Sequence, residues 1–324
     1  MTEVKDVKRL RQELAELQAL PLKEKVDLTK ELINKGLSEG KAAVMWSGGK
    51  DSTALLHMVQ EQQSDVIVLW NNTGVEFPET WPFIKQIRHD WNLNLHIARP
   101  KDGVNFWWCV ERYGWPLFGK HVRSSTHHVQ VRRLSQRVEK AVKVARISSY
   151  CCDWLKKKPT IALLRESGVK VQILGNMVAE SDMRWFAWID TGEFYFSKAA
   201  RRWKLTPMYF WTDDDVWAYH EAYHLPHCGL YDKGFYRDGN WICHKRNGCW
   251  TCGMDIAFLN NHLSIMRHTH PKLWRFLMIE KGLGQVLLAI KLALRDDQLD
   301  FFQRDRIEGI LEQRPCYFDN LRGL

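Results

Sequence analysis

The chain has 324 residues, a hydrophobic fraction of 45% and 47 basic against 38 acidic side chains, which gives a net charge of +9. These values exclude an intrinsically disordered chain, and the length suits one large domain or two moderate ones with a buried core. The charged start and the lack of any apolar run of about 18 residues argue against a signal peptide and a membrane span. We therefore expect a cytoplasmic protein whose eight cysteines are ligands or reactive groups rather than disulfides. A basic surface with 16 tryptophans also suits nucleic acid, although most tryptophans in proteins are core residues.

Helices and strands alternate along the first two thirds of the chain. Apolar spacing predicts helices at 3–19, 22–37, 51–61, 79–92, 135–148, 160–167 and 213–224. Apolar runs predict buried strands at 41–46, 65–71, 94–99 and 169–175. The segment 226–253, rich in Gly, Cys and His, is predicted to be an irregular loop, and 256–313 is helical in period. This alternation predicts an α/β fold with a parallel sheet covered by helices on both faces.

The segment "VMWSGGKDSTAL" at 44–55 places a Gly-Gly pair between a predicted strand and a predicted helix. Glycines let backbone N–H groups approach an anion closely, and the helix start adds its positive end. The spacing is not that of the Walker loop, which has four residues between its first Gly and Gly-Lys. The residues that we expect to bind phosphate are Ser47, Gly48, Gly49, Lys50, Asp51 and Ser52. Asp51 could also position a metal ion or cap the helix.

The string S-G-G-K-D-S resembles the PP-loop of ATP pyrophosphatases, which split ATP between its α and β phosphates and often adenylate a substrate. Three further segments resemble one branch of these proteins, the phosphoadenosine phosphosulfate (PAPS) reductase family. They are "NNTGVEFPET" at 71–80, "ILGNMVAESDMR" at 173–184 and "WTDDDVWAYHEAYHLPHCGLYDKGF" at 211–235. The resemblance covers about 41 to 253.

The resemblance implies a twisted, mainly parallel sheet of the adenine nucleotide alpha-hydrolase type, with ATP and Mg²⁺ at the C-terminal edge of the strands. It implies Lys50 and Asp51 as catalytic residues and adds Thr73, Gly74, Gly175, Glu180 and Arg184 to the ATP-binding residues, with Ser181 in the same motif. We expect a helical lead-in at 1–38, a PP-loop ATP pyrophosphatase domain at 39–225 and a cysteine-rich loop with a helical C-terminal region at 226–324.

The chain departs from the family pattern in two places. Met177 stands where the family motif G-x-R has an arginine, which removes one phosphate or sulfate contact. The reductases carry a catalytic cysteine in E-C-G-[IL]-H near the C-terminus, whereas Cys316 lies in "EQRPCYFDNLRGL". We therefore do not expect Cys316 to form a thiosulfonate.

Two cysteine groups have the spacing of a metal site. "YCCDWLKKKP" contains Cys151 and Cys152, and "WICHKRNGCWTCGMD" contains Cys243, Cys249 and Cys252. A C-x2-C pair on a turn presents two thiolates to one metal, and further cysteines complete the site. Spacing by itself does not separate zinc from an iron–sulfur cluster. Cys109 and Cys228 are isolated, and we expect them to be structural.

The resemblance to known proteins ranks the possible sets of cysteine ligands. Adenylylsulfate reductases hold a [4Fe–4S] cluster with Cys-Cys and a distant C-x2-C, whereas the ATP pyrophosphatase component of DNA phosphorothioation systems has one cysteine before an "LK-x-x-P" segment and then "G-C-W-x-C". The second pattern, which this chain matches more closely, implies a [4Fe–4S] cluster on Cys151, Cys243, Cys249 and Cys252. Under the first pattern Cys152 replaces Cys243, and either way a spare thiol could carry a persulfide.

The function that we expect is ATP-dependent sulfur transfer to nucleic acid, with DNA phosphorothioation favoured and a cysteine desulfurase or another protein as sulfur donor. A basic stretch from Lys120 to Arg146 could line a phosphate channel, and a homodimer is compatible with this reading. The alternatives are an adenylylsulfate or PAPS reductase and a non-catalytic nucleic-acid-binding module with structural zinc.

Overall fold

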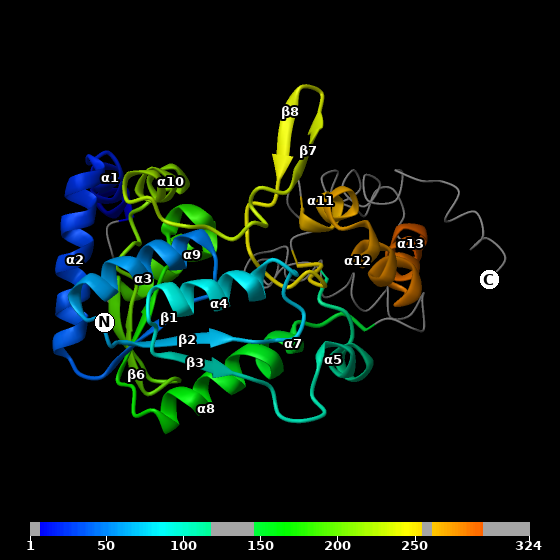
Figure 1. The fold of residues 1–324 in the computed structure, drawn as a ribbon, viewed down its shortest axis with the longest axis horizontal. Coiled ribbons are helices and arrows are strands. Elements are labelled where there is room, and N and C mark those ends of the chain that lie inside the picture. The colour runs from blue at the N-terminus through cyan, green and yellow to red at the C-terminus, as the bar shows by residue number, and fades with distance from the viewer. Residues whose placement is uncertain (1–6, 118–145, 255–260, 294–324) are drawn as a thin grey trace. The chain divides into compact units, whose positions relative to one another are not determined.

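The computed structural model describes residues 7–117, 146–254 and 261–293 (Figure 1). These residues form two compact units, each assembled from separate stretches of the chain. The first comprises 1–72, 78–99 and 158–229, and the second comprises 73–77, 100–157 and 230–324. The helical lead-in belongs to the same unit as the sheet. Residues 100–157, which lie within the expected pyrophosphatase domain, belong to the second unit instead.

The first unit is a six-stranded sheet with flanking helices (Figure 1). Its strands are β1 (Ala42–Met45), β2 (Ile67–Asn71), β3 (Leu95–Ala98), β4 (Val171–Leu174), β5 (Phe194–Ser197) and β6 (Arg202–Leu205). Its helices are α1 (Val7–Gln18), α2 (Leu22–Ser38), α3 (Lys50–Gln62), α4 (Thr80–Asp90), α8 (Lys158–Glu166), α9 (Asp182–Thr191) and α10 (Asp213–Ala222).

The strand order is β3-β2-β1-β4-β6-β5, and every pair is parallel except β5 with β6. Helix α8 covers a core of Ala43, Ile67 and Leu69 on one face, where Leu164 is fully buried. Helices α2 and α3 contact each other and strands β1 and β4, so the central strands are covered by helices as their continuous apolar sequences predict. The predicted α/β class with a mainly parallel sheet is therefore confirmed.

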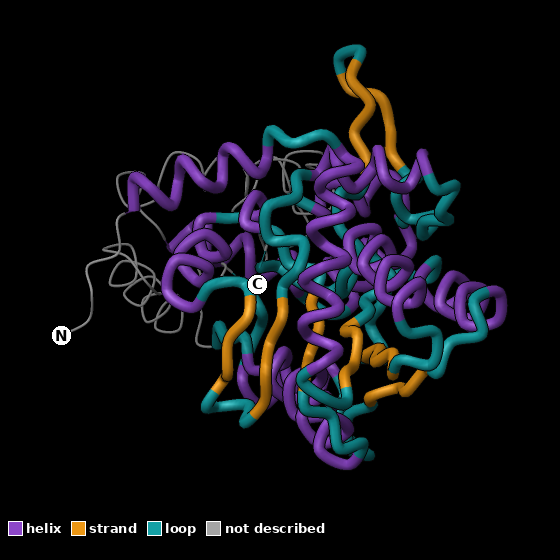
Figure 2. The backbone as a smooth tube through the Cα atoms, turned by 90° about the vertical axis from the view of Figure 1, so that its left-hand side faces the viewer, coloured by secondary structure: helices purple, strands orange, loops and turns teal. Residues whose placement is uncertain are grey.

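The second unit is mostly helical. It contains α5 (Phe106–Tyr113), α7 (Tyr150–Cys152) with a following π-helical turn (Asp153–Lys157), α11 (His262–Thr269), α12 (Pro271–Arg275) with a second π-helical turn (Phe276–Glu280), and α13 (Leu283–Ala293). Its two strands, β7 (Gly234–Arg237) and β8 (Asn240–Cys243), form an antiparallel hairpin that is seen at the top of Figure 2.

Several elements differ from the sequence prediction. The segment 226–253, predicted as irregular loop, contains the β7–β8 hairpin, whose Asp-Gly turn at 238–239 has positive φ angles of 50° and 77°. Both residues adopt the conformation that a two-residue hairpin turn requires. The Asp-Gly pair in the sequence was therefore a signal for a hairpin that the prediction missed. Strands β5 and β6 and helices α5 and α9 were also not predicted. The predicted helix at 135–148 lies almost entirely outside the described residues, and 146–148 are not helical.

Candidate functional site

The phosphate loop lies at the point where the strand order of the sheet reverses. Strand β1 pairs with β2 on one side and with β4 on the other, and the loop leads from the end of β1 into α3. In open α/β sheets, ligands bind at this switch point outside the carboxyl ends of the strands. Gly48 has a φ of 74°, which favours glycine, and Gly49 is the residue before the first helical turn.

Gly175, directly after β4, allows the second strand to approach the same loop. A Cβ atom at this position would lie 3.3 Å from both the carbonyl oxygen of Asp51 and the Cα of Ser52. Both are backbone atoms at the start of α3 and have little freedom to move aside. A side chain at position 175 would be in close contact with this backbone. Glycine at this position therefore allows β4 to approach the loop.

The serine hydroxyls expected to bind phosphate hold the loop together in this structure. Ser47 N–H donates to Ser52 Oγ over 3.1 Å, the two hydroxyl oxygens lie 2.9 Å apart, and Gly49 N–H donates to Ser47 Oγ over 3.2 Å. Thr53 Oγ1 donates to the Gly49 carbonyl over 2.9 Å and accepts from Trp46 Nε1 over 3.0 Å. These bonds keep the backbone of the loop folded at the start of α3.

Lys50 is the buried charge of the loop, with only 3% of its side chain exposed. Its Nζ lies 2.5 Å from Asp51 Oδ1 and 2.5 Å from Asp213 Oδ1. Burial by itself would lower the pKa of Lys50, but the two carboxylates outweigh it and raise the pKa. The ammonium group therefore stays protonated. Sequence analysis missed Asp213, although the acidic run that begins α10 was visible.

Helix α10 is anchored so that Asp213 faces the loop. Lys25, almost fully buried, donates to both oxygens of Asp215 over 2.7 Å, and Thr212 caps the helix. His220 Nε2 lies 2.9 Å from the Lys50 carbonyl oxygen. Burial lowers the pKa of His220, so the ring is neutral and this nitrogen donates its proton to the carbonyl. The ion pair between Asp213 and Lys50 and the bond from His220 to the Lys50 carbonyl therefore both connect α10 to the start of α3.

Asp51 and Asp213 form a donor set that suits magnesium. They come from different helices, and their carboxylates converge on one cationic atom. Mg²⁺ commonly binds through one or two carboxylates together with substrate phosphates. The same two carboxylates would repel the phosphates of a nucleotide unless a cation stood between them, so the residues present fit a magnesium–nucleotide complex.

Glu180 interacts with two other residues of the segment that follows β4. Its carboxylate accepts the Met177 N–H over 3.0 Å and lies 3.7 Å from the guanidinium of Arg184. The Met177 side chain is buried, so an apolar group fills the position where the family motif has an arginine. Arg184 is partly exposed, and it is the cation that remains in this segment.

Thr73 and Gly74, predicted to bind ATP, belong to the second unit. The backbone N–H groups of both donate to the carboxylate of Glu76, over 2.8 Å and 3.0 Å. The Thr73 hydroxyl also lies 3.7 Å from the sulfur of Cys249, and Glu76 pairs with Cys249 through backbone bonds. The structure therefore places this tight turn against one of the predicted metal ligands. The ATP-binding role of the turn stays a prediction.

Four of the predicted cysteines interact in the second unit. The thiols of Cys151 and Cys152 are hydrogen-bonded, and this bond, burial, and the charges of Cys152, Cys252 and Cys249 together raise the pKa of Cys151. Cys243 lies on β8, where it pairs with Gly234. The hydrogen bond from Cys152 and burial are the two largest causes of this shift. The choice between Cys152 and Cys243 as the fourth ligand stays open.

Lys156 lies among these thiols, one turn of helix after Cys152. Its pKa is raised, first by the charge of Cys249, to which it is hydrogen-bonded, and further by Cys152 and Cys252, against the lowering effect of burial. A protonated lysine stabilises thiolates in its surroundings. This residue was not singled out from the sequence, although the "CCDWLK" spacing places it on the same side of a helical turn as the cysteines.

A metal centre at these cysteines stays a prediction. Across 7–117, 146–254 and 261–293, no three His, Cys, Asp or Glu side chains form a group that could hold a metal ion. The thiolate chemistry suits a cluster, but the described side chains do not form a binding group. Cys109 and Cys228 are fully buried, and burial together with Cys152 raises the pKa of Cys109 to about 11. Their predicted structural role is consistent with this burial.

Two other predicted features lie outside the described residues. These are Cys316 and almost all of the basic stretch from Lys120 to Arg146. Within the described part of the chain, none of the helices is both long enough and apolar enough to cross a bilayer.

Known proteins resemble this chain over most of its length. Residues 41–246 match the family model of the phosphoadenosine phosphosulfate reductase domain. The phosphoadenosine 5'-phosphosulfate reductase of Vibrio campbellii is 28% identical over 254 residues, which cover 78% of this chain and 83% of the relative. The enzyme of the same name from Xanthomonas axonopodis pv. citri is 27% identical over 213 residues, 66% of this chain and 74% of the relative. A crystal structure of PAPS reductase from Candida auris aligns with 16% identity and a TM-score of 0.44, covering 74% of this chain and 97% of the other.

Proposed function

This chain belongs to the phosphoadenosine phosphosulfate reductase family, and within it we propose an ATP pyrophosphatase that adenylates a nucleic-acid substrate before sulfur transfer. The observation that carries the proposal is the phosphate loop itself. An intact S-G-G-K-D-S loop lies at the switch point of the sheet, with Lys50 held between Asp51 and Asp213. Such a site suits the triphosphate of ATP and a divalent cation.

The protein's own groups perform the binding and orientation. The protonated Lys50 and the N-terminus of α3 attract the phosphates, and the side-chain-free Gly48, Gly49 and Gly175 let them reach the backbone. Asp51 and Asp213 would hold Mg²⁺, which neutralises the phosphates and makes the α-phosphorus more electrophilic. His220 keeps the start of α3 in place through the Lys50 carbonyl.

In the proposed reaction, a substrate oxygen attacks the α-phosphorus and pyrophosphate leaves. The adenylated oxygen is then a good leaving group: a persulfide sulfur attacks the substrate phosphorus that carries it, the bond from that phosphorus to the oxygen breaks, and the oxygen departs as part of AMP. A second thiol cuts the remaining S–S bond and forms a disulfide, which an external dithiol reduces. The proposal therefore needs a cysteine desulfurase or a similar persulfide donor and a thiol reductant. A DNA backbone phosphate is the substrate that we favour, because the chain is strongly basic.

The buried Met177 supports this choice over sulfonucleotide reduction. An apolar side chain occupies the position where the family motif provides a cation for a phosphate or sulfate group. A binding site for a small, highly anionic sulfonucleotide would lose one of its charged contacts there.

An adenylylsulfate or PAPS reductase is the second candidate, and one observation favours it. The thiols of Cys151 and Cys152 are hydrogen-bonded to each other, and an adjacent Cys-Cys pair is the feature that resembles the adenylylsulfate reductases. The relatives named above are also called PAPS reductases. Under this reading the nucleotide site would accept a sulfonucleotide in place of ATP.

The test is the product formed from ATP that is radiolabelled at the α-phosphate. We expect AMP and pyrophosphate in the presence of Mg²⁺, and we expect both Asp51→Asn and Ser47→Ala to lower the rate by about 10²- to 10³-fold, the usual effect of removing a group that stabilises developing charge. ADP as the main product contradicts the proposal. Release of sulfite from adenylylsulfate with thioredoxin, in the absence of AMP formation from ATP, would establish the reductase instead.

A further inference from the structure

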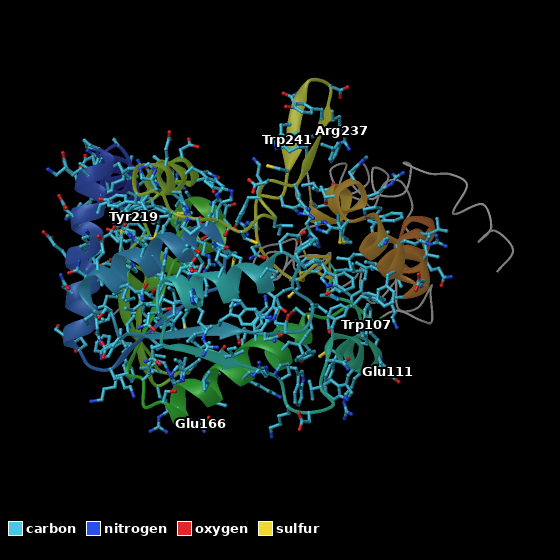
Figure 3. All side chains as sticks on the ribbon, in the orientation of Figure 1. Trp107, Glu111, Glu166, Tyr219, Arg237 and Trp241 are labelled. Carbon is cyan, nitrogen blue, oxygen red and sulfur yellow. The ribbon has the colours of Figure 1, made fainter. Side chains whose placement is uncertain are left out.

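The β7–β8 hairpin presents two large aromatic rings to solvent. Tyr236 and Trp241 are cross-strand partners, and 74% of Tyr236 and 48% of Trp241 are exposed. Their ring centroids lie 5.0 Å apart with the planes tilted by 58°. Figure 3 shows Trp241 and Arg237 on this hairpin, whose strands stand out from the helices beside them. Exposed aromatic pairs are unusual, because each ring leaves a large apolar area in water.

The indole of Trp241 is held in place by its own hairpin. A Cβ atom at Gly234 would lie 2.8 Å from two atoms of the indole ring and closer still to the Ile242 carbonyl oxygen. The ring therefore lies against the bare backbone of β7, a position that only glycine leaves open. The indole is thus held against the strand while about half of it stays exposed to solvent.

The opposite face of the hairpin is anchored to the second unit. Phe235 stacks on His268 of α11 with ring centroids 3.9 Å apart and planes 23° from parallel. Alternate residues of a strand point to opposite faces, so Phe235 faces inward while Tyr236 faces outward. The two-residue Asp-Gly turn at 238–239 keeps the ribbon short and rigid. The exposed pair is thus presented by a supported element.

Basic residues are frequent in the sequence around the aromatic pair. From 233 to 246 the chain has four basic residues, Lys233, Arg237, Lys245 and Arg246, and one acidic residue, Asp238. Arg237, Lys245 and Arg246 are exposed. Aromatic rings that stack on bases, together with basic side chains that follow the phosphates, are how proteins bind single strands without sequence preference.

We propose that the outer face of the β7–β8 hairpin, formed by Tyr236 and Trp241 with Lys245 and Arg246 after β8, binds single-stranded nucleic acid by base stacking. The inference deepens the function proposed above and depends on it for the role of the strand as substrate. It selects a single strand, because bases inside a duplex do not expose their faces to a protein ring.

Fluorescence anisotropy tests the proposal with the full chain and labelled oligothymidylate or oligouridylate of about 20 nucleotides, a length that exceeds typical site sizes. We expect Trp241→Ala to weaken binding by about five- to 150-fold, the range that base–aromatic stacking of about 1–3 kcal/mol gives. Trp241→Phe should recover much of the affinity because it retains a ring. The matched control is Phe196→Ala, which removes another half-exposed ring, from β5.

The salt dependence separates the role of the charges from that of the rings. Lys245→Gln and Arg246→Gln should each reduce the slope of log K against log salt by about 0.7, because one fewer counterion is released from a single strand. Trp241→Ala should lower the affinity and leave the slope unchanged. The two oligonucleotides distinguish DNA from RNA as the source of the strand.

Equal affinity of Trp241→Ala and the unchanged protein for both oligonucleotides overturns the proposal, and so does tighter binding of a duplex than of either strand. A change of oligomeric state in Trp241→Ala, with oligonucleotide binding intact, assigns the surface to contacts between protein chains instead. A different result would contradict the proposed function, namely the absence of AMP formation from ATP. The hairpin takes no part in that reaction, so the two failures can be distinguished.

Discussion

The phosphate loop and the cysteine region are built in opposite ways. The loop is a continuous stretch of six residues whose shape is maintained by hydrogen bonds among its own members, such as those between Ser47 and Ser52. The cysteine region brings together residues near 74, 152 and 250, and the turn at Thr73 contacts Cys249 across 176 positions of sequence. A local site is specified by adjacent residues, whereas an assembled site depends on the packing of everything between its parts.

The largest expected effect is the loss of metal when cysteines of the predicted metal site are replaced. We expect protein purified without oxygen to contain iron and sulfide, and we expect Cys249→Ser and Cys252→Ser to remove them because serine does not replace a thiolate ligand. Cys109→Ser, a change at a buried cysteine, is the control and should keep the metal. Iron and acid-labile sulfide analysis measures this, and an equal metal content in all variants would refute the assignment.

The same measurement decides the fourth ligand. The closer resemblance, with Cys243 as ligand, predicts that Cys243→Ser loses the metal and that Cys152→Ser retains it. The reverse result would assign the pattern of the adenylylsulfate reductases, with Cys152 as ligand. Zinc in place of iron would support the binding-module alternative.

The next effect concerns the phosphate loop and the residue that the sequence did not identify. Asp213→Asn removes one of the two carboxylates on Lys50 and should lower the rate of pyrophosphate release by about 10- to 100-fold, as is typical for groups that support a metal site. Asp214→Asn removes the same charge from the neighbouring exposed position and should leave the rate near that of the unchanged protein. Equal rates for the two variants would exclude Asp213 from the site.

A smaller effect follows from the close approach of β4 to the loop. Gly175→Ala forces a methyl group to within 3.3 Å of the backbone of Asp51 and Ser52 and should lower the free energy of unfolding by about 1–3 kcal/mol. Gly229→Ala is the matched control, because a Cβ atom there would have no neighbour within 4 Å. Chemical denaturation measures both. If Gly175→Ala is as stable as the control, the loop has more freedom than its contacts indicate.

The smallest effect is a dependence of stability on pH in the first unit. Burial lowers the pKa of His220 and of His57, so in acid the unfolded chain binds protons that the folded chain does not. The free energy of unfolding should therefore fall as the pH drops below about 6.5, by up to about 1.4 kcal/mol per pH unit for each histidine. His220→Gln should reduce this slope, because glutamine can still donate to the Lys50 carbonyl but does not titrate.

The sequence by itself determined the class of the fold and the local chemistry of the phosphate loop. Four predicted strands appear as β1 to β4, because continuous apolar runs must be buried on both faces of a sheet. The loop was recognisable because its glycines, its lysine and its helix start are adjacent in the chain. Strand β6 was missed because basic residues interrupt its apolar positions, and β5 because its few aromatic residues follow Glu193 and end at a serine.

Only the tertiary structure decided which distant residues meet. It brought Asp213 to Lys50 and placed Thr73 beside Cys249, since no spacing rule relates residues separated by more than a hundred positions. It also oriented the hairpin so that Phe235 faces α11 and Trp241 faces solvent. That orientation depends on strand register, because a shift of one residue would exchange the two faces.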